Sequence, residues 1–95
     1  MNVYTTLTAG LDEVLTTAKY KSPVTRRIDI CNRYNTAIAS LMQQDISDLD
    51  RAKIRGIKGL ITKTIVDSLN DDELEHYINC FVKDVLMKYF GDYTI

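Results

Sequence analysis

Side chains suited to catalysis or metal binding are few in this sequence. Its 95 residues include one histidine, His76, and two cysteines, Cys31 and Cys80. His76 and Cys80 are spaced to share a helix face, but a structural zinc site needs a larger set of ligands. No GxSxG, HExxH or Walker-type sequence is present. We therefore expect no catalytic residue, no metal site and no cofactor, and we expect both cysteines to be buried free thiols.

Basic residues gather around two glycines. Arg55, Lys58 and Lys63 accompany Gly56 and Gly59, and Arg26 and Arg27 form a second basic pair. Residues 54–65 loosely resemble the helix-hairpin-helix element of DNA repair proteins, which binds DNA phosphates through backbone amides at a glycine hairpin. The matching positions are Ile54, Gly56, Ile57 and Ile65, whereas Lys58 replaces the second hairpin glycine and Thr62 the usual alanine. The resemblance implies nucleic-acid binding through Arg26, Arg27, Arg55, Lys58 and Lys63, which is the alternative function.

A second interpretation keeps this region in one continuous helix. Ala52, Gly56, Gly59 and Lys63 then lie on one line, opposite an isoleucine face. Because glycine inside a helix costs about 1 kcal/mol relative to alanine, two glycines indicate a packing role. The line predicts a narrow groove for a helix of the same chain or of a partner protein.

The C-terminal region is more apolar than one helix of a bundle requires. At a uniform helical pitch, its apolar residues cover an arc of about 220°. We expect part of this surface to bind another molecule, with Tyr89, Phe90 and Tyr93 as its exposed aromatic edge.

Four helices would position these residues. Apolar spacing predicts helices over about 3–20, 22–44, 48–69 and 71–90. Ser22, Ser47 and Asn70 are expected as N-caps, and Gly91 as a left-handed C-cap. In the first helix, five threonines and Gly10 oppose helix formation, so a short strand at Val3 to Leu7 is the alternative there.

Charges are grouped at the helix connections. Lys19, Lys21, Arg26 and Arg27 flank the first connection, and an acidic group that includes Asp71 flanks the third. In an up-down bundle both connections lie at the same end, so we expect the two groups to neutralise each other.

Composition places the chain among ordinary folded proteins. Twelve basic and thirteen acidic residues give a net charge of −1, which provides no overall attraction to nucleic acid or anionic lipid. No apolar run approaches the roughly 20 residues that a membrane-spanning helix needs, and no signal peptide is apparent at the start. We expect a cytoplasmic protein that does not bind membranes.

The sequence thus predicts an all-α fold: one domain over residues 1–95, a compact up-down four-helix bundle with short connections. We interpret it as a non-enzymatic protein–protein interaction module that also forms a homodimer. By analogy of size, a stoichiometric inhibitor, adaptor or immunity-type protein of bacteria or phages is expected.

Overall fold

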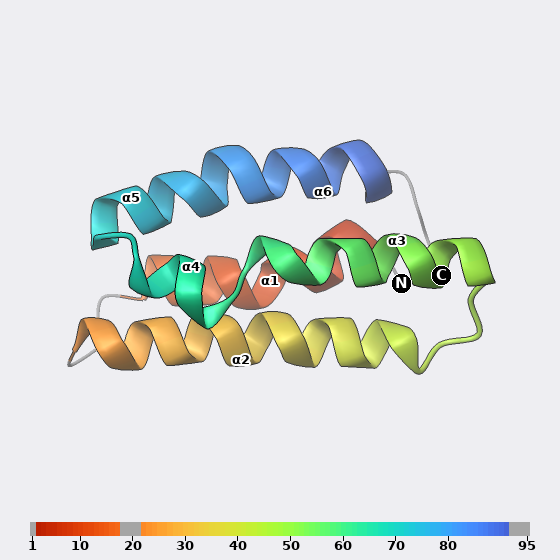
Figure 1. Cartoon of the computed structure of the whole chain (residues 1–95), viewed down its shortest axis with the longest axis horizontal. Helices are drawn as coiled ribbons and strands as arrows, with labels where there is room; N and C mark the ends of the chain where they lie inside the picture. The colour runs from red at the N-terminus through yellow and green to blue at the C-terminus, as the bar shows by residue number, and fades with distance from the viewer. Residues whose placement is uncertain (1, 18–21, 92–95) are drawn as a thin grey trace.

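A computed structural model describes residues 2–17 and 22–91 of the chain, and within them the fold is an all-α four-helix bundle, as predicted. Figure 1 shows neighbouring rods running antiparallel. In chain order the elements are α1 (Val3–Thr16), α2 (Pro23–Met42), α3 (Asp48–Ile57), the 3₁₀ turn η1 (Lys58–Leu60), α4 (Lys63–Asp67), α5 (Asp71–His76), the π-helical segment η2 (Tyr77–Val82) and α6 (Lys83–Phe90).

Over the described residues, the bundle has four helical rods, packed around one core. They are α1, α2, α3 continued by η1 and α4, and α5 continued by η2 and α6. In Figure 1, α5 and α6 run along the top and α2 along the bottom, with α1 behind and α3 and α4 in front. The most extensive contact joins α1 to α2; α1 also packs on α6, and α2 packs on α3 and α4. The core therefore lies between the four rods, and α3 and α6 are neighbours on the front face.

Polar side chains start the helices. Asn2, Ser22, Ser47 and Asn70 each accept a hydrogen bond from the backbone N–H three residues ahead. The Glu73 side chain in turn accepts a hydrogen bond from the backbone N–H of Asn70, which completes a capping box. The three predicted caps are confirmed, and the predicted strand alternative near the start is wrong because Asn2 caps α1 there.

The third predicted helix is broken, contrary to expectation. Ile61 is extended, with φ −127° and ψ 106°, and the Thr62 hydroxyl accepts a hydrogen bond from the Ile65 N–H at 3.2 Å to begin α4. In a continuous helix, Val66 would point about 140° away from Ile61. The break allows both side chains to be buried, at 2% and 1% exposure.

The fourth predicted helix spans its expected range but contains the π-helical segment η2. Five residues at steps of four are buried along it, namely Leu74, Ile78, Val82, Leu86 and Phe90. In an α-helix each step of four overshoots a full turn by about 40°. A π turn holds more residues, so steps of four through η2 fall short of a full turn and offset this drift. The insertion therefore keeps one straight apolar stripe in the core.

Gly91 does not form the predicted left-handed cap. Its φ of −54° is right-handed. Its N–H donates to the Met87 carbonyl oxygen at 2.9 Å, so the helical hydrogen bonding continues into this residue.

Tyr34 links two rods inside the core. Its side chain is fully buried on α2, and its hydroxyl donates to the Ile57 carbonyl oxygen at 2.7 Å. The hydrogen bond satisfies a carbonyl oxygen in the last turn of α3, where the backbone carbonyls have no N–H partner within the helix. Burial raises the pKa of Tyr34, so the hydroxyl stays protonated in this position.

Candidate docking groove between α3 and α6

A groove of about 400 Å³ separates α3 from α6. We call it the α3/α6 groove; its lining residues are Lys53, Gly56, Ile57, Leu60, Val85 and Tyr89. Two residues predicted to contact a partner, Gly56 and Tyr89, thus meet in one surface hollow. The sequence had placed them on separate helices without indicating that they are neighbours.

Gly56 leaves the α3 side of this groove bare. A Cβ atom built at Gly56 or at Gly59 would meet no atom within 4 Å, outside its own helix turn. The expected packing of a helix of the same chain against these glycines is therefore wrong among the described residues. The other predicted occupant, a helix of a partner protein, stays a hypothesis for what packs against the exposed backbone at these glycines.

The predicted line from Ala52 to Lys63 is not one surface. The break at Ile61 and Thr62 places Lys63 on α4, where its Nζ lies 3.2 Å from Asp67 Oδ2. Ala52 is exposed on α3 but does not line the α3/α6 groove. Of the predicted small-residue line, Gly56 is the member that reaches the groove.

The opposite wall includes Val85 and Tyr89, which belong to a second stripe at steps of four. Tyr77, Phe81, Val85 and Tyr89 lie beside the buried stripe, and Phe81 and Tyr89 are 50% and 54% exposed. At a uniform pitch both stripes had merged into one wide arc. The π-helical segment instead separates a buried row from a more exposed row, of which Val85 and Tyr89 line the groove.

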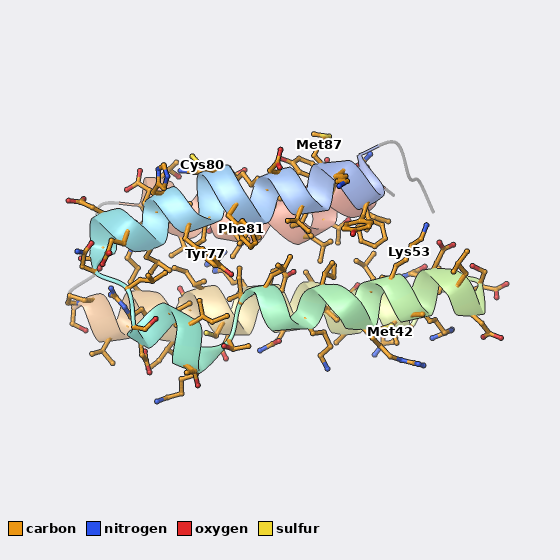
Figure 2. The ribbon with its side chains drawn as sticks, turned by 45° about the horizontal axis from the view of Figure 1, so that its top comes forward. Met42, Lys53, Tyr77, Cys80, Phe81 and Met87 are labelled. Carbon is orange, nitrogen blue, oxygen red and sulfur yellow. The ribbon has the colours of Figure 1, made fainter. Side chains whose placement is uncertain are left out.

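Phe81 is held in place although it is half exposed. Its ring stacks on that of Tyr77, with centroids 5.3 Å apart and planes inclined by 24°. The Tyr77 hydroxyl donates to the Leu60 carbonyl oxygen at 2.6 Å, which ties this pair to η1 across the groove. Figure 2 shows both rings in the space between the upper and lower rods. Burial also raises the pKa of Tyr77, so its hydroxyl remains a donor.

Phe90, one of the predicted aromatic contacts, is not available at this site. Phe90 is 1% exposed and belongs to the core, so its assignment to an exposed edge is wrong. The π-helical segment rotates it into the buried stripe, which a uniform pitch could not indicate. Tyr93 lies outside the described residues.

The basic residues proposed for nucleic-acid binding are not brought together. Arg55 and Lys58 are exposed at the end of α3, whereas Lys63 is on α4 and paired with Asp67. Arg26 and Arg27 lie on α2, where their Nη1 atoms are 3.9 and 2.7 Å from Asp71 Oδ1. The predicted neutralisation of basic and acidic groups is confirmed for these two arginines; Lys19 and Lys21 lie outside the described residues.

Arg27 is a structural residue rather than an anion site. It is 9% exposed, and its Nε and Nη2 donate to the carbonyl oxygens of Val66 at 3.0 Å and Leu69 at 2.6 Å. Its Nη1 donates to Asp71 and to the Pro23 carbonyl oxygen. We call these contacts the Arg27 clasp. Its assignment to nucleic-acid binding is wrong because its donors are directed into the chain.

A second hollow, of about 620 Å³, lies beside this clasp between α2 and α4. Val24 and Ile28 of α2 line it and are 65% and 54% exposed. Their exposure follows from the short α4, which covers less of α2 than the predicted long helix would. We call this hollow the α2/α4 groove.

The two cysteines are free, but only Cys31 is partly covered, and Cys80 is exposed. The expectation of two buried thiols is therefore wrong for Cys80. Burial raises the pKa of Cys31, with a further contribution from the Asp67 carboxylate. Cys80 Sγ lies 3.6 Å from His76 Nδ1, yet no metal-binding group of three or more such residues exists in the part of the chain that the structure describes.

The groove was only partly detectable from sequence. Lys53 and the Tyr77–Phe81 pair were missed, although Tyr77, Phe81, Val85 and Tyr89 follow one another at steps of four. That spacing was the available signal. The pitch change at η2 makes this signal clearer, because at a uniform α-helical pitch the four residues spread over an arc of about 120° instead of lying in one row.

Comparisons with protein-family models, curated proteins and solved structures find no significant match to this chain. Among residues 2–17 and 22–91, no helix combines the length and apolar character needed to cross a bilayer.

Proposed function

We propose that this chain is a non-enzymatic protein–protein interaction module that binds through the α3/α6 groove. The observation that carries the proposal is the half-exposed Tyr89, which lines the groove with the bare backbone of Gly56, and the half-exposed Phe81 eight residues before it in the same stripe. A few residues carry most of the binding energy of a protein interface, and tyrosine is enriched among them, especially in well-packed pockets. A stoichiometric inhibitor, adaptor or immunity-type protein is the kind of role included in the proposal.

The fixed orientation of Phe81 supports this function. Side-chain ordering on binding costs free energy, and a ring already held by stacking avoids part of that cost. Tyr77 supplies the stacking, and its hydrogen bond to Leu60 fixes it in turn. The described residues therefore present a preformed apolar contact rather than one assembled on binding.

Nucleic-acid binding has less support as the alternative. Arg27 and Lys63 are engaged with Asp71 and Asp67, which leaves Arg55 and Lys58 as a short exposed basic segment. Phosphate contacts give affinity that falls steeply with salt. Binding to DNA or RNA at low salt that is lost on Arg55→Ala or Lys58→Ala would favour this alternative.

The proposal is tested by affinity capture from the native host with wild type, Tyr89→Asp and Met87→Asp. Met87 is 52% exposed on the same helix but does not line the groove, so it is a matched control. We expect Tyr89→Asp to lose a protein that wild type and Met87→Asp retain. If all three recover the same proteins after circular dichroism has confirmed their folding, the groove is not the binding surface.

A further inference from the structure

We propose that the occupant of the α3/α6 groove is a second copy of this chain, with the two α6 helices antiparallel about a twofold axis at Val85. This inference rests on the proposed function, because it uses the same groove and names the partner. It predicts a homodimer whose interface is the same surface on both copies.

The apolar stripe is symmetric about Val85. Phe81 and Tyr89 lie four residues to either side of it, one helical turn away in each direction. In an antiparallel pair with its axis at Val85, Phe81 faces Tyr89 of the second copy, and the same contact is repeated across the axis. Val85 then faces its own counterpart. The stripe is therefore complementary to itself in one orientation.

The charges beside the stripe are complementary in that same orientation. Asp84 and Lys88 are exposed on the solvent side of the stripe, and neither has an ion pair with another described residue. The twofold rotation keeps this flank on the same side of the interface and reverses its direction. Asp84 of each copy is then offset by two residues, about 3 Å along the helix axis, from the position opposite Lys88 of the other copy, which is within reach of the lysine side chain and gives two opposite-charge pairs.

A parallel pairing lacks this complementarity. It would place Phe81 beside Phe81 of the second copy, and its twofold rotation would put the flanks that carry Asp84 and Lys88 on opposite sides of the interface, so no Asp84–Lys88 pair between copies would form. The antiparallel orientation is therefore the one in which apolar and charged groups match together.

The α3 wall has room for the incoming ring. Gly56 borders the groove together with Val85 and Tyr89, and the space above its Cα is open. Because Phe81 of the second copy faces Tyr89, its ring arrives at this bare part of the wall. A side chain at Gly56, beginning with the Cβ of alanine, would occupy the space that the ring needs.

Charge exchange tests the orientation directly. The purified protein, Asp84→Lys, Lys88→Asp and an equal mixture of the two variants are compared by sedimentation velocity over a concentration series. Wild type should reach twice the monomer mass. Each variant alone has like charges at both pairs, so its dimer dissociation constant should rise about tenfold or more. In the mixture, a copy of one variant meets a copy of the other, and a lysine then faces an aspartate at both pairs. A heterodimer should therefore form with affinity close to wild type.

The other outcomes overturn the inference. A wild type that remains monomeric at every concentration removes the second copy as occupant. Single variants that dimerise like wild type, or a mixture that fails to associate, remove the antiparallel arrangement. Met87→Asp should dimerise like wild type, and circular dichroism verifies that all variants fold, since these positions are exposed. If wild type is monomeric but Tyr89→Asp still fails to capture a protein that wild type captures, the homodimer inference fails and the proposed function is retained.

Discussion

The α2/α4 groove and the α3/α6 groove differ in how fully their basic side chains are used in contacts within the chain. Beside the α2/α4 groove, Arg27 donates to three carbonyl oxygens and to Asp71. In the α3/α6 groove, the cation Lys53 has no hydrogen bond or ion pair with another described residue. Arg27 thus holds segments of the chain together, whereas Lys53 lies on an open surface.

The difference follows from how the rods end at each place. At the α2/α4 junction, α4 is short and its last carbonyls have no helical partners, so a donor such as Arg27 is needed there. Beside the α3/α6 groove, the carbonyl oxygens of Ile57 and Leu60 already accept hydrogen bonds from the Tyr34 and Tyr77 hydroxyls, so no groove cation is needed to satisfy them. Side chains on that surface are therefore free to contact another molecule, whereas those at the junction are committed to the fold.

The largest expected effect on stability comes from comparing two phenylalanines of the fourth rod, one in the core and one on the surface. Phe90→Ala should lower the free energy of unfolding by about 4 kcal/mol, because it opens a cavity in the core. Phe81→Ala should lower it by about 1 kcal/mol, since half of that side chain is already exposed. Urea denaturation followed by circular dichroism measures both. Equal losses would contradict the assignment of Phe81 to the surface.

The Arg27 clasp gives the next largest effect. Arg27→Met should lower the free energy of unfolding by about 3 kcal/mol, because it leaves the carbonyls of Val66 and Leu69 without donors and Asp71 without its close partner. Arg26→Met is the matched control, since Arg26 lies 3.9 Å from Asp71, and it should cost less than about 1 kcal/mol. Thermal unfolding of both variants measures the difference. A loss at Arg26 as large as that at Arg27 would show that the clasp is not specific.

Helix number and most helix ends were predictable because they depend on local chemistry. Ser22 and Asn70 bond to backbone groups only three residues away, so the sequence contains both partners. The break at Ile61 was not predictable in this way. It depends on burying both Ile61 and Val66 against other rods, and that requirement is absent from the local pattern.

The candidate site was predictable as residue types but not as a surface. Gly56 and Tyr89 were identified because glycine inside a helix and a surplus aromatic residue are unusual locally. Phe90 was misplaced because its direction depends on the π-helical segment, which no short motif indicated. Arg27 was misplaced because its partners on α4 and α5 are about forty residues away in sequence.

The smallest expected change in the free energy of unfolding is at Gly56, and it is a stabilisation rather than a loss. Gly56→Ala should raise the free energy of unfolding by about 0.5 kcal/mol, because alanine favours the helix and its Cβ meets no other atom. Gly10→Ala is the control: its Cβ would lie 3.0 Å from Arg33 Cβ, and that crowding should cancel the gain. Urea denaturation of both variants measures the contrast. A stabilised Gly56→Ala that binds its partner less tightly would show that the bare backbone serves contact at the expense of stability. Stabilisation with unchanged binding would instead show that the occupant does not need the space above Gly56.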